Sequence, residues 1–153
     1  LAPTDLNVLL SQVCGEYQQR LEKQVLEPVL SLCEPGAAAM ADGRLLWRVL
    51  DNLMSNICKY AMPGTRVYLT TEREGDTARM VVRNISRYPL NISADELTER
   101  FVRGDSSRST EGSGLGLSIA TSLMSLQGGG FRLTIDGDLF KVTLTLPAAG
   151  AEE

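Results

Sequence analysis

The sequence is 153 residues long, which is the size of one ordinary domain, and 43% of its residues are hydrophobic, so it can bury a substantial core. Its formal net charge of -4 argues against a general nucleic-acid binder, which would usually be basic. No apolar run approaches the roughly 18 residues needed to span a bilayer, and no signal peptide is recognisable. We therefore expect a soluble domain that contacts neither nucleic acid nor membrane directly.

Histidine is absent, which removes the commonest general base and the commonest metal ligand. Any catalysis must then use carboxylates, amides, cations or a bound ion. The three cysteines, Cys14, Cys33 and Cys58, are far apart and lack CxxC spacing. They favour a reducing cytosol over a disulfide framework or a zinc site. The chain begins at Leu1, so we expect it to be a fragment of a longer protein.

The first half of the chain predicts helix, strand and helix. Thr4 and Asp5 precede a helical pattern of apolar residues that reaches Tyr17. Residues 24–33 form a short apolar run that predicts a strand, and Pro28 marks it as an edge or a bulge. The alanine-rich stretch after Gly36 favours no single structure. Asp42 then predicts an N-cap for residues 43–61, the strongest helix in the sequence.

The second half predicts one hairpin before a helix and one hairpin after it. Residues 66–72 and 77–85 alternate in hydrophobicity around Glu74, Gly75 and Asp76. The polar stretch 87–110 is irregular apart from a helical turn at 94–100. Residues 115–127 predict the helix, and residues 131–135 and 139–146 predict the second hairpin. From Pro147 onward we expect a frayed tail, and the whole predicts one α+β domain with helices over one face of a mixed sheet.

The long helix carries the first group of residues that can support chemistry. On a helical wheel Asn52, Asn56 and Lys59 fall about 90° away from an apolar stripe, which is formed by Leu46, Val49, Leu50, Leu53 and Ile57. Amide oxygens can bind a hard cation and an ammonium can bind phosphate, as Mg-nucleotide binding requires. The alternative is a solvated polar face that happens to contain two asparagines. Asparagine is a poor helix former, which weakens that alternative.

The second group is a glycine-rich segment, 111–118, that runs directly into the helix 115–127. Its glycines let the backbone approach a ligand closely, and a helix start directs free N–H groups at an anion. Arginines suit triphosphate recognition. The preceding stretch adds three of them around one phenylalanine, namely Arg100, Phe101, Arg103 and Arg108. The alternative interpretation is a flexible turn after an exposed charged loop.

Three segments in this order resemble the motifs of one family, the catalytic domains of sensor histidine kinases, which share a superfamily with gyrase B, Hsp90 and MutL. Residues 52–60 (NLMSNICKY) resemble its N box, residues 99–108 (ERFVRGDSSR) its F box and the start of its mobile ATP lid, and residues 112–117 (GSGLGL) its G2 box. The resemblance implies a two-layer α/β sandwich of the Bergerat type. That fold has a mixed sheet of about five strands, three main helices on one face and an ATP lid. The domain would span residues 1–147, followed by a flexible tail at 148–153.

The resemblance also implies ATP and Mg²⁺ as cofactors and assigns roles to single residues. Asn56 would bind Mg²⁺, with Asn52 close by. Lys59 would contact phosphate, Tyr60 would lie near the nucleotide, and Arg103 would reach the γ-phosphate from the lid. The backbone amides of the G2 box would cradle phosphate oxygens, and the remaining residues implied in the nucleotide site are Phe101, Gly112, Gly114, Leu115, Gly116 and Leu117.

One motif departs from the family. Where the family usually has Asp-x-Gly-x-Gly, whose Asp accepts a hydrogen bond from the adenine amino group, this chain has Asn84-Ile-Ser-Arg-Tyr88. An asparagine oxygen can still accept that bond, and its NH₂ can donate to a ring nitrogen. The amide lacks the charge assistance of a carboxylate. Adenine affinity and base selectivity at Asn84 are therefore open questions.

The resemblance favours a kinase over a hydrolase. The gyrase-like members have a glutamate one turn before the Mg-binding asparagine, and here that position is Asn52, which cannot act as a base. Without a histidine the chain cannot phosphorylate itself. We expect the acceptor on a separate dimerisation domain, a response regulator as a later partner, and a cytoplasmic location within a membrane-anchored receptor. Two alternatives stay open, a nucleotide-deficient pseudokinase-like interaction domain and a free-standing anti-sigma-type serine kinase.

Overall fold

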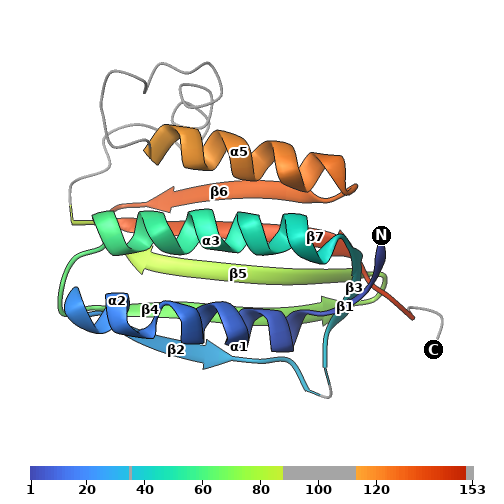
Figure 1. The fold of residues 1–153 in the computed structure, drawn as a ribbon, viewed down its shortest axis with the longest axis horizontal. Coiled ribbons are helices and arrows are strands. Elements are labelled where there is room, and N and C mark those ends of the chain that lie inside the picture. Colours follow the sequence, from blue (N-terminus) through green and yellow to red (C-terminus); the bar gives the residue numbers. More distant parts are fainter. Residues whose placement is uncertain (35, 88–112, 151–153) are drawn as a thin grey trace.

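The protein forms two layers, a five-stranded sheet and a layer of helices that covers one of its faces (Figure 1). The computed structural model describes residues 1–34, 36–87 and 113–150. The sheet consists, in spatial order, of β2 (Glu27–Ser31), β4 (Arg66–Glu74), β5 (Thr77–Ile85), β7 (Leu139–Pro147) and β6 (Gly130–Asp136). Strand β2 is parallel to β4, and the other neighbours are antiparallel.

The helix layer contains α1 (Leu6–Glu16), α3 (Gly43–Tyr60) and α5 (Ser113–Leu126), with the short α2 (Gln18–Lys23) following α1. This arrangement confirms the predicted α+β class, the two-layer sandwich, and the mixed five-stranded sheet with three main helices on one face. The apolar positions of the strands alternate, so one row on β5 packs beneath the helices: Ala78, Met80 and Val82 are each at most 2% exposed. The core lies between that row and the helices.

The best-predicted element is α3, because its signals are local. The Asp42 carboxylate accepts hydrogen bonds from the backbone N–H groups of Arg44 and Leu45, which confirms the N-cap. The predicted apolar stripe is buried throughout, and Met54 and Cys58 extend it. At the other end Ala61 is extended and caps the helix, because Pro63 cannot continue it.

The N-terminal part differs from the prediction in three ways. The helix predicted to reach Tyr17 ends there as α1, and a second short helix, α2, follows it without having been predicted. The strand expected at 24–33 is shorter, since Val25 has a left-handed backbone (φ 59°) that cannot join a ladder. A ribbon of β1 (Ala2–Asp5) and β3 (Ala38–Ala41) pairs residues far apart in the chain, and no signal predicted it. Alanine has little preference for strands, so that pairing depends on tertiary contacts.

The expected tail at 148–153 is wrong for its first residues. Ala148 and Ala149 are buried, each 8% exposed. The N–H of Ala148 donates to the Asp76 carbonyl at 2.7 Å, and that of Ala149 to the Ala38 carbonyl at 2.9 Å. The domain therefore includes these residues, because small side chains after Pro147 can pack against the β1–β3 ribbon. Residues 151–153 lie outside the described part of the chain.

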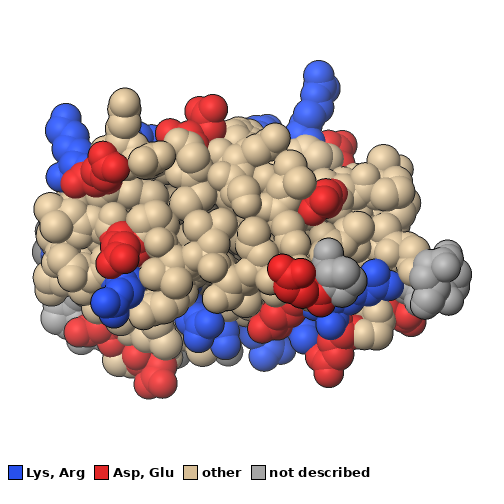
Figure 2. Space-filling view, turned by 90° about the horizontal axis from the view of Figure 1, so that it is seen from below, with Lys and Arg blue, Asp and Glu red and all other residues tan. Residues whose placement is uncertain are grey.

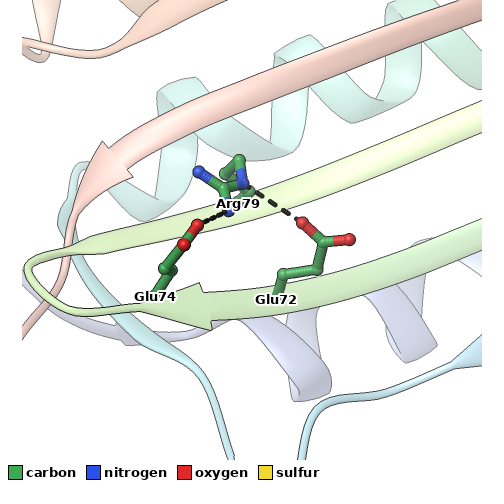
Figure 3. A network of polar contacts seen from close by, with 3 residues as sticks. All are labelled: Glu72, Glu74 and Arg79. Atoms are coloured by element: carbon green, nitrogen blue, oxygen red, sulfur yellow. Dashed lines mark hydrogen bonds and ion pairs between the residues drawn. The ribbon is translucent and has the colours of Figure 1, made fainter.

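The outer face of the sheet carries charged side chains of both signs. Figure 2 shows that blue and red groups are also interspersed on the side seen from below, towards α1, α2 and β2. At the β4–β5 hairpin the Arg79 guanidinium lies 3.1 Å from the Glu72 carboxylate and 2.6 Å from that of Glu74 (Figure 3). Such exposed pairs contribute little stability. No helix among the described residues is long and apolar enough to cross a membrane.

Candidate functional site

The predicted site residues gather at one end of the helix layer, where α3 ends, α5 begins and β5 ends (Figure 1). Hydrogen bonds tie two of these segments together. The Met62 N–H donates to the Ile85 carbonyl and the Arg87 N–H to the Tyr60 carbonyl, both at 2.8 Å, and Ala61 forms a bridge with Ser86. The end of α3 is therefore fixed against the end of β5.

Two amides line the flank of α3 that is turned towards α5. Asn52 and Asn56 lie about 100° and 140° round the helix from Asp51, whose side chain contacts α1. Both asparagines are half-buried, at the border of the apolar stripe. Within the described residues neither side-chain amide takes part in a hydrogen bond. An amide that solvent reaches, and that no described protein group engages, is available to a ligand.

Asp51, the residue directly before Asn52, shows the opposite behaviour. The Tyr17 hydroxyl donates to the Asp51 carboxylate and also lies 3.1 Å from the Asp51 carbonyl oxygen. Burial first, and then the hydrogen bond to Asp51, raise the pKa of the Tyr17 hydroxyl, so it stays protonated as a donor. This contact anchors the middle of α3 to the junction of α1 and α2.

Asn84 is the most buried of the predicted polar residues, at 6% exposed. It occupies the same face of β5 as Met80 and Val82 and so points towards the helices. In the described part of the chain its amide has no hydrogen-bond partner. The Asn84 amide therefore offers one acceptor and two donors to a ligand that lies between the sheet and the helices.

The start of α5 contributes backbone groups. The helix begins at Ser113, two residues before the predicted start, so Gly114, Leu115 and Gly116 fall in its first turn. The first four N–H groups of a helix lack partners within it and favour an anion. Leu117 is 3% exposed and belongs to the core. Three predicted site residues, Phe101, Arg103 and Gly112, lie outside the described residues.

The C-terminal end of α3 carries a cation and an aromatic ring. Lys59 is exposed and Tyr60 is half-buried. Among the described residues, no cluster of three or more cysteine, aspartate or glutamate side chains could hold a metal ion. A site for Mg²⁺ would then depend on an amide oxygen together with ligand phosphates, a combination that Mg²⁺ accepts because it usually keeps several waters. The unpaired oxygen of Asn56 fits that requirement.

Comparison with known proteins decides the family. Residues 41–150 match the family described as histidine kinase-, DNA gyrase B- and HSP90-like ATPases. The chain belongs to this family. Within it, the chain is an ATP-binding catalytic domain of the sensor histidine kinase type, because its relatives include the sensor histidine kinase HprS of Escherichia coli, which is 35% identical over 68% of this chain and 23% of that protein.

Two curated relatives illustrate how much of a sensor protein the chain represents. The probable sensor protein PcoS of Escherichia coli is 32% identical over 145 residues, covering 92% of this chain and 31% of that protein. The sensor protein VanSC of Enterococcus gallinarum is 32% identical over 149 residues, covering 95% and 41%. The chain thus spans well under half the length of these relatives.

Solved structures agree on the fold. The catalytic domain of histidine kinase ThkA has a TM-score of 0.82 at 22% identity, with 95% of this chain and 94% of that one covered. Full-length ShkA in complex with AMPPNP has a TM-score of 0.78 at 27% identity, with 97% of this chain and 31% of that one covered.

Three polar residues that organise the helix layer were not predicted from the sequence. Asp51 and Tyr17 join α3 to α1. Gln127, which is 2% exposed, accepts from the Asp42 N–H at 2.9 Å and donates to the Leu123 carbonyl at 3.2 Å, so it joins α5 to the start of α3. The only sequence signal for Gln127 was a polar residue at the end of an apolar helix.

Proposed function

We propose that this chain binds Mg-ATP and transfers the γ-phosphoryl group to a histidine on a separate dimerisation domain. The observation that carries the proposal is the set of unpaired amides at the end where α3, α5 and β5 meet, in a chain of this ATPase family. Two of the amides come from α3 and one from β5. Each amide can offer a ligand one acceptor and two donors without breaking a hydrogen bond within the described residues.

Asn56 is assigned as the Mg²⁺ ligand through its side-chain oxygen, with Asn52 one turn away on the same flank. When bound, Mg²⁺ supplies positive charge to the phosphate oxygens. Lys59 would contribute a point charge to phosphate, and Arg103 would reach the γ-phosphate. These groups position and neutralise the triphosphate, which is most of what phosphoryl transfer requires of a protein.

The nucleotide would lie between α3 and α5, over the end of β5. The N–H groups of Gly114, Leu115, Gly116 and Leu117 would bind phosphate oxygens, and Asn84 would bind the base. Tyr60, Phe101 and Gly112 would complete the site. Asn84 supports this assignment because its buried amide can accept from the adenine amino group while donating to a ring nitrogen.

The choice of phosphoryl acceptor depends on two groups that the chain lacks, a base that could activate water and a histidine. Asn52 cannot activate water, and the sequence contains no histidine. An imidazole on another domain needs no such base, because it is itself the nucleophile. Hydrolysis of ATP by this chain alone would then be very slow. We propose a histidine-bearing dimerisation domain and a response regulator as partners, and a location on the cytoplasmic side of the membrane.

The test is calorimetric titration of ADP and AMPPNP into the chain, with and without Mg²⁺. We expect binding that requires Mg²⁺ and falls about 10- to 100-fold in Asn56→Ala, since a bond to a charged partner is worth about 1.5–3 kcal/mol. The matched control is Ser55→Ala on the neighbouring position of α3, which should bind normally.

Addition of a histidine-bearing dimerisation domain with labelled ATP should then label that domain and not this chain. An absence of nucleotide binding at millimolar concentration would contradict the proposal and favour the pseudokinase-like interaction domain. Binding without transfer to histidine, but with transfer to serine on a protein, would favour the anti-sigma-type kinase.

A further inference from the structure

A hollow lined by cations lies between α2, the end of α3 and Arg87, the second residue after β5. Its volume is about 540 Å³. Four of its lining side chains are positively charged, namely Arg20, Lys23, Lys59 and Arg87, and no carboxylate is among the described residues that line it. This composition is unusual for a chain with a net charge of -4.

The charges of Arg20, Lys23 and Arg87 are not neutralised by ion pairs within the described residues. The ion pairs there involve Arg66 and Arg79, which lie elsewhere. Arg20 stacks over the Tyr17 ring at 4.7 Å, which leaves its charge in place. The Nε of Arg87 is buried and has no hydrogen-bond acceptor in the described part of the chain. A buried donor without a partner costs free energy, so Arg87 in particular is short of an anion.

The ends of the neighbouring helices cannot supply the missing negative charge. A helix carries roughly half a negative charge at its C-terminus, and α2 and α3 both end at this hollow. Together they offset about one of the three charges on Arg20, Lys23 and Arg87. An excess of roughly two positive charges therefore remains on Arg20, Lys23 and Arg87 together.

We infer that this hollow binds a compact phosphate-type anion that carries at least two negative charges. Guanidinium groups bind two phosphate oxygens at once, and an ammonium adds a point charge. The concave shape admits a small anion to all of these groups together. Gln24 adds an amide donor at the edge.

This anion site differs from the proposed nucleotide site. Arg20 and Lys23 come from α2, beside the flank of α3 that faces α1, whereas Asn52 and Asn56 occupy the flank that faces α5. Lys59 and Tyr60 line the hollow and are also assigned to the nucleotide site, so the two sites adjoin there. The inference does not depend on nucleotide binding, since none of the amides takes part in it.

The test is a pyrophosphate titration of the chain, followed by NMR at constant ionic strength, with saturating Mg-ADP present and absent. We expect shifts at residues 20–24 and 87 in both conditions. Lys23→Gln should weaken binding about 3- to 5-fold, the value of one exposed charge pair. Arg20→Gln with Lys23→Gln should weaken it about 10-fold, if the two effects add. Arg44→Gln, an exposed cation at the far end of α3, is the matched control and should change nothing.

Two results would overturn the inference while leaving the nucleotide proposal intact. One is Mg-ADP binding without any pyrophosphate response at residues 20–24. The other is complete displacement of pyrophosphate by Mg-ADP, which would assign the hollow to the nucleotide site. Pyrophosphate binding without Mg-ADP binding would instead contradict the proposed function alone. A second arm with phosphatidic-acid vesicles separates a free phosphate from a lipid headgroup, because only the latter gives co-sedimentation that Lys23→Gln reduces.

Discussion

The two ends of the helix layer treat their polar groups in opposite ways. Where α3 starts and α5 ends, the Asp42 carboxylate caps α3 and Gln127 bonds to both Asp42 and Leu123. Along the C-terminal half of α3, beside the start of α5 and the end of β5, the side-chain amides of Asn52, Asn56 and Asn84 have no hydrogen-bond partner among the described residues. We call these regions the closed end and the open end. The named side chains of the closed end form hydrogen bonds within the chain, and the three asparagines of the open end form none within its described part.

The difference separates a structural role from a binding role. The side-chain atoms of Asn52, Asn56 and Asn84 are not among the fully buried polar atoms that lack a partner, so solvent reaches them when no ligand is present. They add little to the stability of the fold, which the closed end, the core and the Tyr17–Asp51 contact supply. Substitutions at the closed end should therefore lower stability, and substitutions at the open end should lower affinity.

The largest stability effect is expected at Gln127, at the closed end. Gln127→Leu keeps the size of the side chain but leaves the Asp42 N–H and the Leu123 carbonyl without their partner. We expect the free energy of unfolding to fall by about 2 kcal/mol, measured by urea denaturation. Gln18→Leu, at an exposed position of α2, is the control and should change it by less than about 0.5 kcal/mol. Equal effects of the two substitutions would contradict a special role for Gln127.

A smaller effect is expected at Tyr17. Tyr17→Phe removes the hydrogen bond to Asp51, which remains exposed to water, so the loss should be about 1 kcal/mol at neutral pH. Tyr68→Phe, on the exposed face of β4, serves as the control. Nucleotide affinity should stay unchanged if the contact only anchors α3, and titration of the same variant checks this.

The raised pKa values of Tyr17 and two cysteines predict that the free energy of unfolding depends on pH. Burial raises the pKa of the Cys14 and Cys58 thiols above the usual 9.0, and burial with the Asp51 bond raises that of Tyr17 above the usual 10.0. The folded chain therefore holds these protons more tightly than the unfolded chain. Stability is fully present below about pH 9 and falls as the pH rises through the raised values. Tyr17→Phe should flatten the fall above pH 10, and denaturation curves across that range measure it.

Asn84 tests how the open end selects its base. Asn84→Asp adds a charge to the hydrogen bond with the adenine amino group, so Mg-ADP affinity should rise about 5-fold. The same carboxylate cannot donate to the guanine carbonyl, so GDP binding should fall and the ADP/GDP ratio should increase. Parallel titrations of both nucleotides measure this ratio. An unchanged ratio would remove Asn84 from the base site.

The smallest stability effect is expected for Asn52→Ala, and it separates the binding role of the open end from a structural role. Asn52→Ala removes an unpaired amide and introduces the best helix former, so the unliganded chain should become more stable by about 0.5 kcal/mol. Mg-ADP affinity should fall at the same time. Urea denaturation and titration of the one variant show whether stability and affinity move in opposite directions. Loss of both would mean that Asn52 has a structural partner.

The closed end shows what sequence reasoning can and cannot reach. The helix α3 was predicted because its cap and its apolar stripe lie within one segment. The bond between Gln127 and Asp42 joins residues 85 positions apart, and the bond between Tyr17 and Asp51 joins residues 34 positions apart. No local pattern encodes such pairs. The β1–β3 ribbon and the buried Ala148 were missed for the same reason.

At the open end, the sequence predicted which residues belong to the site but not how they are buried or how the elements that carry them are joined. Asn52 and Asn56 were found because two asparagines one turn apart are unfavourable in a helix unless they have a use. Asn84 was found only by comparison with a family motif that it breaks. Its burial, and the fixing of the end of β5 against the end of α3, became evident from the structure. The cation-lined hollow joins α2, α3 and Arg87 and has no sequence pattern.

The most direct test of the account is to follow the side-chain NH₂ resonances of the asparagines by NMR while Mg-ADP is added. The account predicts large shifts for Asn52, Asn56 and Asn84. It predicts no shift for Asn7, whose NH₂ already donates to the Cys33 carbonyl at 2.9 Å. Saturation by Mg-ADP with Asn52, Asn56 and Asn84 unmoved, or with Asn7 shifted equally, would contradict the claim that the open end reserves its amides for the nucleotide.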